Sequence, residues 1–323
     1  MPCRVKPGMT IPDPARLTRA SLLRGALAAA VSSGLGGWPA RAATPTEGTK
    51  MHTRIIPSSG KPLPVIGCGT WQTFDIGHDA AQLAQRAEVL RVLFEAGGSV
   101  IDSSPMYGSS EEVAGDALAA IDGRAQAFIA TKVWTRGRSA GIEQMRRSMA
   151  LLRAERIDLM QIHNLVDWRT QLPTLRAWKA EGRIGYLGLT HYTSAAYDEL
   201  EQVLRAEPVD FVQLNYAIND RAAEQRLLPL AAERGIAVIV NQPFGGGGLL
   251  RSLLAQPLPG WAGEIGCASW AQLLLKFVLA HPAITCAIPG TGRPEHMRDN
   301  VQAGIGAIPD RASWGPRLTA LGF

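Results

Sequence analysis

The sequence predicts an α/β protein in which eight parallel strands, each followed by a helix, close into a (β/α)₈ barrel (TIM barrel). Two observations carry this prediction. From residue 51 onward, short apolar runs alternate with amphipathic helical segments, as expected for parallel strands that helices cover on the outside. Eight such units follow one another within about 250 residues, which is the usual size of this barrel.

The elements are expected in strict alternation. Near-continuous apolar runs place the strands at 65–67, 99–103, 127–133, 157–163, 184–190, 209–215, 237–241 and 284–289. Amphipathic segments place the helices at 82–96, from 109 onward, and at 142–153, 172–181, 195–205, 222–234, 269–280 and 294–303. Gly97 and Gly98 end the first helix, and Ser109 is expected to cap the second, which has acids in its first turn. A Rossmann fold is rejected, because Gly67-Cys68-Gly69 lacks the third glycine of that motif and no helix begins there.

The composition is that of a globular protein, with 46% hydrophobic and 19% charged residues among 323. The net charge of +5 is concentrated at the start of the chain, where residues 1–42 hold six basic residues against one acid. The remainder has 27 basic and 27 acidic residues. The charge therefore does not indicate a nucleic-acid partner.

Residues 1–42 have the pattern of an export signal. Three arginines precede the apolar stretch 25–35, and Ala40-Arg41-Ala42 supplies a small-x-small cleavage pattern. Residues 17–23 resemble a twin-arginine motif in which Ala20 replaces the second arginine. The apolar stretch is too short for a stable membrane anchor. We expect a linker at 43–52, the barrel at 53–323 and a periplasmic or exported protein, whereas translation from Met51 would give a cytoplasmic one.

The cysteines beyond this segment indicate neither a metal site nor a disulfide framework. Cys68, Cys267 and Cys286 are widely spaced and odd in number. No metal is expected.

Polar residues that end strands mark the expected active site, because the active sites of these barrels lie at the C-terminal ends of the strands. Asp102, Lys132 and His163 end the second, third and fourth strands, and Thr190 and Gln213 lie at or near the ends of the next two. Each residue alone has a structural explanation, such as a solvated strand end or a core histidine. Together they indicate a site.

With these motifs in order, the chain from about residue 53 to 303 resembles an aldo-keto reductase. Its tetrad maps onto Asp102 and Tyr107 in the segment Asp-Ser-Ser-Pro-Met-Tyr-Gly, Lys132 in Ala-Thr-Lys-Val and His163 in Gln-Ile-His-Asn. Further matches lie at 67–71, 213–216 and 288–300. The resemblance implies an NAD(P)H-dependent oxidoreductase that reduces aldehydes and ketones to alcohols.

The side chains suit that chemistry. Reducing a carbonyl builds negative charge on its oxygen, which needs a proton donor. A free tyrosine has a pKa near 10, which Lys132 is expected to lower, while Asp102 keeps the lysine charged. Tyr107 is therefore the expected general acid, and the resemblance implies that His163 holds the carbonyl oxygen.

The resemblance also implies a bound nicotinamide dinucleotide, with NADP(H) preferred and NAD(H) as the alternative. Tyr216 would stack on the nicotinamide, Gln213 and the pair Thr190-His191 would bind its carboxamide, and the loop 242–249 would approach the pyrophosphate. His191 departs from the asparagine usual in the family. The adenosine end would meet the helix from Pro294, where Gly290 and His296 replace the family's lysine and arginine.

The full set of expected cofactor-binding residues is Gly69, Thr70, Trp71, Asn164, Thr190, His191, Gln213, Tyr216, Gln242, Phe244, Gly245, Gly290, Thr291, Arg293, His296 and Asn300.

The substrate is expected to be a small carbonyl compound, because Trp71, Met106 and Trp134 would form an apolar mouth. A monomer is the default oligomeric state. Two other functions stay open at this point. One is a regulatory or partner module that binds the nucleotide with little turnover. The other is a metal-dependent barrel hydrolase, for which no ligand cluster is apparent.

Overall fold

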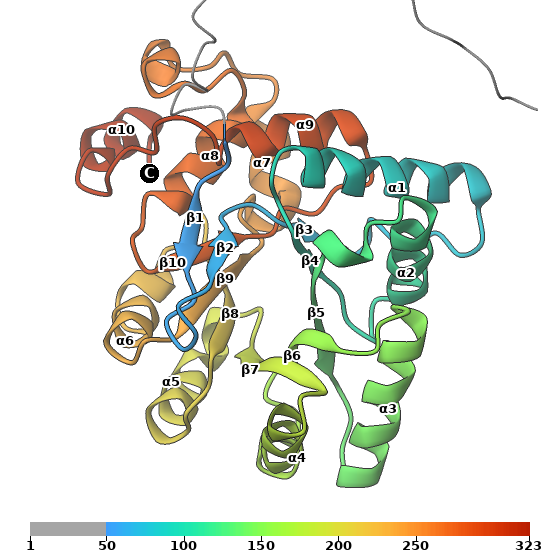
Figure 1. Ribbon diagram of the computed structural model, residues 1–323. Coiled ribbons are helices and arrows are strands. Elements are labelled where there is room, and N and C mark those ends of the chain that lie inside the picture. Colours follow the sequence, from blue (N-terminus) through green and yellow to red (C-terminus); the bar gives the residue numbers. More distant parts are fainter. Residues whose placement is uncertain (1–49) are drawn as a thin grey trace, which may run out of the picture. The chain divides into compact units, whose positions relative to one another are not determined.

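The computed structural model describes residues 50–323 (Figure 1). The expected export segment 1–42 and most of the linker 43–52 lie outside the described residues. Eight strands form one parallel sheet in sequence order. They are β3 (Cys68–Gly69), β4 (Val100–Asp102), β5 (Phe128–Val133), β6 (Ile157–His163), β7 (Ile184–Thr190), β8 (Phe211–Asn215), β9 (Ala237–Asn241) and β10 (Ile284–Ala287).

The sheet closes on itself where its first and last strands meet. Ile66 pairs with Ala287 and Gly69 with Gly290, both in the parallel sense. The Gly67 amide donates to the Ala287 carbonyl at 2.9 Å, which joins the same two edges. The prediction of a (β/α)₈ barrel is therefore confirmed.

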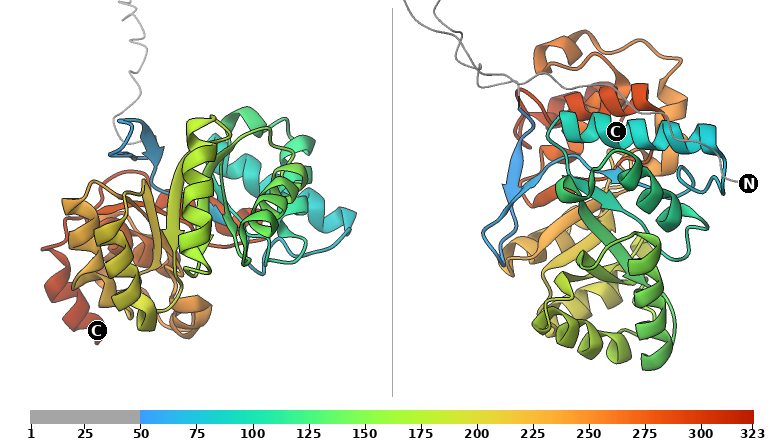
Figure 2. Two further views of the ribbon diagram at one scale, coloured as in Figure 1. Left: turned by 90° about the horizontal axis from the view of Figure 1, so that it is seen from below. Right: turned by 45° about the vertical axis from the view of Figure 1, so that its right-hand side comes forward.

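Eight helices alternate with these strands and lie outside the barrel (Figures 1 and 2). They are α1 (Ala80–Glu95), α2 (Ser110–Ala120), α3 (Arg138–Leu151), α4 (Trp168–Ala180), α5 (Tyr197–Ala206), α6 (Leu227–Glu233), α8 (Trp270–Leu279) and α9 (Pro294–Gln302). Ser109 is the N-cap residue of α2, as expected, but its side chain makes no capping hydrogen bond. The Ser109 hydroxyl instead donates to Asp75 at 2.9 Å.

Three further elements were not expected from the sequence. A hairpin of β1 (Thr53–Ile55) and β2 (Pro62–Pro64) precedes the barrel, α7 (Gly248–Leu253) follows β9, and α10 (Trp314–Leu321) follows α9. Leu63 of the hairpin joins the buried cluster inside the barrel, while Arg54 donates to the His281 carbonyl at 2.8 Å. Trp314 is fully buried, with its ring edge-on to Phe277 at 5.3 Å.

The barrel interior changes from apolar to polar along the strands. Successive strand residues point to opposite sides, so Phe128, Ala130 and Lys132 of β5 share the inner side. Phe128 and Ala130 belong to the apolar interior cluster, with Leu159 and Phe211 from neighbouring strands. Lys132 lies beyond them at the C-terminal end. This arrangement places the polar strand-end residues together at one end of the barrel.

Candidate active site

A buried ion pair forms the base of the site. Lys132 Nζ lies 2.7 Å from Asp102 Oδ2, and the two side chains are 1% and 4% exposed. The ammonium also donates to the Ser103 carbonyl at 2.7 Å. Burial by itself lowers the pKa of Lys132, but Asp102 and Tyr107 raise it by more, so the pKa ends above its ordinary value. Lys132 is therefore charged across the physiological range.

Tyr107 lies over this ion pair, on the loop after β4. Lys132 Nζ is 5.1 Å from the centre of its ring. Burial raises the pKa of the phenol, and this effect outweighs the Lys132 ammonium, which lowers it. Lys132 does lower the Tyr107 pKa, as expected, but burial raises it by more, so the net shift of this pKa is upward. The phenol is consequently a protonated hydrogen-bond donor at neutral pH.

His163 completes the group at the end of β6. Its ring meets the Tyr107 ring edge-on, with 5.9 Å between centres, and is 5% exposed. Burial, Lys132 and His191 lower its pKa to about 2. The imidazole is therefore neutral. The structure thus brings together Asp102, Tyr107, Lys132 and His163, the four residues that the sequence indicates for catalysis.

Gln161 belongs to the same polar layer and was missed in the sequence. Its Nε2 atom donates to Asp102 Oδ1 and to Gln213 Oε1, each at 3.3 Å. This side chain links the ion pair to Gln213, which is 1% exposed. Gln161 precedes His163 by two residues, so strand alternation alone places both on the inner side.

The segment after Asp102 is fixed by buried hydroxyl groups. Thr70 Oγ1 donates to the Asp102 carbonyl at 3.0 Å and to Ser103 Oγ at 2.9 Å. Ser104 Oγ lies 2.9 Å from His163 Nδ1. Thr70, Ser103 and Ser104 are each 0% exposed. Ser103 and Ser104 were not indicated as site residues, because serine after a strand is a common loop residue.

The strand register brings the expected carboxamide-binding residues next to His163. Thr190 pairs with His163 on one side and with Gln213 on the other. The His191 amide donates to the Gln213 carbonyl at 3.1 Å, and the His191 ring stacks on Tyr192. These contacts place the Thr190-His191 pair at the open end of the barrel.

Three amide oxygens near these strand ends have no hydrogen-bond partner within residues 50–323. They are Gln161 Oε1 on β6, Asn164 Oδ1 just after β6, and Asn241 Oδ1 at the end of β9. Asn164 also has a left-handed backbone, with a φ of 54°, which asparagine tolerates better than most residues. A buried orphan acceptor is costly unless a ligand donor satisfies it. Asn164 thus fits its expected role, and Asn241 is a further candidate.

Tyr216 does not lie where the sequence analysis expects it. Its side chain is 0% exposed, its ring stacks on Phe277 at 5.6 Å, and its hydroxyl donates to Glu224. Tyr216 follows the inward-facing Asn215 at the end of β8, and alternation turns it the other way. The expected stacking on a nicotinamide does not fit a ring with no exposed face.

The glycine-rich loop after β9 has a backbone that suits anion binding. Gly245, Gly246 and Gly247 have φ angles of 58°, 66° and 84°, and Gln242 has one of 49°. Glycine adopts this region without steric cost, and consecutive amides in such loops can face an anion. Phe244 is half-buried against the core. The Gly245 and Gly247 amides already donate to the Gln242 and Phe244 carbonyls of this loop, and its pyrophosphate role stays a prediction.

The expected adenosine end lies beside the barrel seam. Gly290 pairs with Gly69, and Asn300 of α9 is 3% exposed. Thr291 Oγ1 accepts a hydrogen bond from the Arg293 amide at 3.1 Å. The Arg293 guanidinium is exposed and lies 3.2 Å from Glu295. His296 is also exposed.

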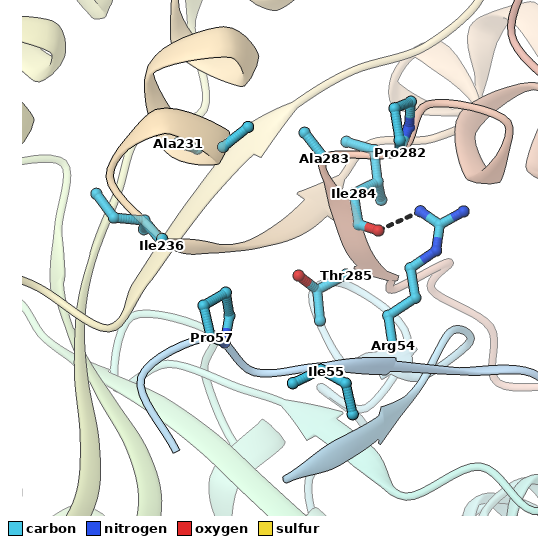
Figure 3. Close-up of a pocket in the computed structure, with 11 residues that line it drawn as sticks. Arg54, Ile55, Pro57, Ala231, Ile236, Pro282, Ala283, Ile284 and Thr285 are labelled. Carbon is cyan, nitrogen blue, oxygen red and sulfur yellow. Dashed lines mark hydrogen bonds between the residues drawn. The ribbon is translucent and has the colours of Figure 1, made fainter. Parts of the chain in front are cut away.

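Three large side chains surround the open end. Trp71 is 50%, Met106 39% and Trp134 41% exposed, and the Trp134 ring lies 6.5 Å from that of His163. By contrast, the pocket in Figure 3 lies between the hairpin and the N-terminal ends of β9 and β10, away from the tetrad. Its Arg54 is engaged with backbone carbonyls. Of the three large side chains, Trp134 is thus an exposed ring that lies next to His163.

Two features are absent from residues 50–323. No three histidine, cysteine or carboxylate side chains lie together in a way that could hold a metal ion. No helix in this range is long and apolar enough to cross a membrane.

Comparison with known proteins identifies the family. The chain is 29% identical to methylglyoxal reductase YeaE of Escherichia coli over 258 residues, covering 77% of this chain and 89% of the relative. It is 27% identical to the NADH-specific methylglyoxal reductase of Escherichia coli over 300 residues, covering 75% and 90%.

A solved structure gives the same result. The aldo/keto reductase of Klebsiella pneumoniae, in complex with NADP and acetate, superimposes with a TM-score of 0.70 at 26% identity, covering 83% of this chain and 94% of that one. The model of the aldo/keto reductase family matches residues 65–311. This protein therefore belongs to the aldo/keto reductase family of oxidoreductases.

Proposed function

We propose that this protein uses a reduced nicotinamide dinucleotide to convert small aldehydes and ketones to alcohols. One observation carries the proposal. A solvent-sealed lysine–carboxylate pair lies against a phenol whose neighbour is a neutral histidine. Two neutral proton-bearing groups next to a fixed positive charge are suited to an oxygen that becomes negative during reaction.

The residues present fit the cofactor. The orphan oxygen of Asn164, with Gln213 and Thr190 nearby, suits the donor group of a carboxamide. The left-handed glycine loop suits a pyrophosphate. When bound, the reduced nicotinamide supplies the hydride, which no side chain can provide.

The protein's own groups handle the proton. His163 donates a hydrogen bond to the carbonyl oxygen and orients it. Tyr107 then gives its phenol proton to that oxygen, and the Lys132 ammonium stabilises the phenolate that remains. Asp102 holds Lys132 in place and keeps it charged. In the reverse direction, the same phenolate acts as the general base.

The cofactor preference is proposed as NADP(H), with NAD(H) as the alternative. The structural neighbour named above binds NADP, while one relative is NADH-specific. Arg293 and His296 are the exposed side chains nearest in sequence to the expected 2′-phosphate position. Because Arg293 already pairs with Glu295, the affinities for NADP(H) and NAD(H) are expected to differ only slightly.

The proposed substrates are short aldehydes and ketones, with 2-oxoaldehydes such as methylglyoxal first among them. Two relatives are methylglyoxal reductases. The exposed Trp71 and Trp134 would accommodate larger apolar carbonyl compounds as well.

The test compares wild type with Tyr107→Phe. Turnover is measured by NADPH and NADH oxidation over a panel of aldehydes and ketones, and nucleotide binding by quenching of tryptophan fluorescence. The proposal expects turnover in wild type and binding without turnover in the variant. A wild type that binds nucleotide but reduces no carbonyl compound would instead support a nucleotide-binding module.

A further inference from the structure

We propose that Ser104 is a positioning residue that fixes the His163 imidazole in the tautomer with its proton on Nε2. This assignment rests on the proposed reductase function, in which His163 donates to the carbonyl oxygen.

The contact itself is close and sealed from solvent. Ser104 Oγ lies 2.9 Å from His163 Nδ1. Ser104 is 0% exposed and His163 is 5% exposed. A hydrogen bond between two buried groups is worth more than one at the surface, because bulk water does not compete for either partner.

The direction of this bond follows from the other partners of Ser104. The Met106 amide donates to Ser104 Oγ at 3.5 Å, so that oxygen already accepts a hydrogen bond. Within residues 50–323, the Ser104 hydroxyl has no other acceptor than His163 Nδ1. If Nδ1 carried the proton, the buried hydroxyl hydrogen would have no acceptor, which is costly. Ser104 therefore donates and Nδ1 accepts.

The consequence concerns the other ring nitrogen. A neutral imidazole carries one proton, so an accepting Nδ1 puts that proton on Nε2. No residue in the described part of the chain forms a hydrogen bond with His163 Nε2. The ring lies beside Tyr107, with 5.9 Å between centres. The Nε2 proton is thus the donor that remains for a carbonyl oxygen next to the phenol.

Ser104 is the third of three consecutive residues that contact Lys132 or His163. The Asp102 carboxylate and the Ser103 carbonyl hold the Lys132 ammonium at 2.7 Å each. The next residue, Ser104, holds the histidine. Three consecutive residues therefore position both charged and neutral partners of Tyr107, and the loop that begins with them also carries that tyrosine.

The decisive measurement is the protonation pattern of the histidine nitrogens. The full chain, labelled with ¹⁵N-histidine, is examined by long-range ¹H–¹⁵N correlation from pH 6 to 8, and His163 is assigned by comparison with His163→Asn. Wild type should show a protonated Nε2 and an unprotonated Nδ1. A proton on Nδ1 would overturn the proposal, and this result needs no variant at Ser104.

Turnover adds a second readout. Ser104→Ala should alter the His163 nitrogen signals and lower kcat by roughly 10- to 100-fold, the size of the effect when a partner that orients a metal-bound imidazole is removed. Ser104→Cys keeps the shape with a weaker donor, so its kcat should lie between the two. Unchanged His163 signals and unchanged kcat in Ser104→Ala would contradict the assignment.

Ser103→Ala is the matched control, because it removes an equally buried hydroxyl that does not touch His163. Its His163 signals should equal those of wild type. If they change as in Ser104→Ala, the effect is one of general packing and the proposal fails. A wild type without turnover would refute the proposed function, while the nitrogen signals would still decide the tautomer.

Discussion

Lys132 and Asp102 form an ion pair of 2.7 Å that is almost completely removed from solvent. Taking two charges out of water is expensive, and apolar residues of similar size often stabilise a fold equally well. The pair is therefore poorly explained as a stability device. Its position against the Tyr107 ring, 5.1 Å from Lys132 Nζ, supplies the fixed positive charge that the proposed reaction needs beside the phenol.

Replacing one partner of this pair should destabilise the protein more than expected from replacing both partners together. Lys132→Met leaves a buried carboxylate without its cation, and Asp102→Asn leaves a buried ammonium without its anion. Each should lower the free energy of unfolding by about 3–5 kcal/mol. The double variant should lose clearly less than the sum. Urea unfolding at pH 7 measures all three.

The exposed ion pair between Arg293 and Glu295 serves as the control for that cycle. Its single and double variants should each change the unfolding free energy by less than about 1 kcal/mol. Strictly additive losses for Lys132→Met and Asp102→Asn would show that the two charges do not depend on one another.

The pH dependence of catalysis should follow the raised pKa of Tyr107. Burial keeps the phenol protonated above its ordinary range despite Lys132. Reduction needs the protonated phenol, so kcat for reduction should stay flat from neutral pH to about pH 10 and fall only above it. Alcohol oxidation needs the phenolate, so its kcat should rise over the same range.

The measurement is kcat in both directions at constant ionic strength. A reduction rate that halves near pH 7 would mean that Lys132 controls the phenol more strongly than burial does. Tyr107→Phe should lower kcat by about 10²- to 10⁴-fold while its nucleotide binding stays near that of wild type.

The sequence was sufficient to predict the barrel and the convergence of Asp102, Lys132 and His163, because both depend on features that are local in the chain. Apolar runs place the strands, and strand ends place Asp102, Lys132 and His163 at one end of the barrel. The register then brings them together without further information. The same rule would also have found Gln161, two residues before His163.

Other features depend on contacts between distant residues. That the Tyr216 ring has no exposed face depends on its packing against Phe277, 61 positions further along the chain. The hairpin strands have three residues each, too few for a periodic pattern. The role of Ser104 depends on a histidine 59 residues away. The net shift of the Tyr107 pKa depends on how deeply the phenol is buried.

His163 should make the protein acid-sensitive. Its folded pKa of about 2 lies below the ordinary value of 6.5, so the unfolded chain binds one more proton between these values. The contribution of His163 to the free energy of unfolding should therefore be fully present above pH 6.5 and decrease as the pH falls from 6.5 towards 2. The loss attributable to His163 is about 1.4 kcal/mol for each pH unit well below pH 6.

His163→Asn removes this contribution, so its unfolding free energy should depend less steeply on pH between 6 and 4. Urea unfolding at half-unit intervals gives the slope. An asparagine variant at the exposed His78 should keep the wild-type slope. Equal slopes for wild type and His163→Asn would show that the imidazole is not sealed from protons.

We propose that residues 1–42 direct export. The basic n-region, the apolar stretch and Ala40-Arg41-Ala42 support this. Protein purified from the periplasm should then begin near Ala43, as read by N-terminal sequencing. Replacing Arg16 and Arg19 with glutamate should reduce the exported fraction, because the n-region then loses its positive charge. Protein found in the cytoplasm with Met51 at its N-terminus would contradict the proposal.

Glu111 of α2 is a buried carboxylate outside the catalytic group, and its two oxygens accept hydrogen bonds from Thr131 at 2.5 Å and Ser148 at 3.0 Å. Burial raises its pKa, although the two hydroxyls lower it. The folded state thus binds the proton more tightly than the unfolded state, and stability falls as the pH rises through the carboxyl range. Glu111→Gln keeps the shape without the charge, and its amide oxygen can accept from one of the two hydroxyls while its NH₂ group donates to the other.

The glutamine variant should therefore be at least as stable as wild type at pH 8. At pH 5, where Glu111 of wild type takes up its proton, the stability of wild type should rise relative to that of the variant. Glu111→Ala should instead lose about 2–5 kcal/mol at both pH values, because it leaves the Thr131 and Ser148 hydroxyls buried without their acceptor. Urea unfolding at the two pH values separates charge from shape. A glutamine variant as unstable as the alanine variant would mean that the ionised carboxylate itself stabilises the helix–strand contact.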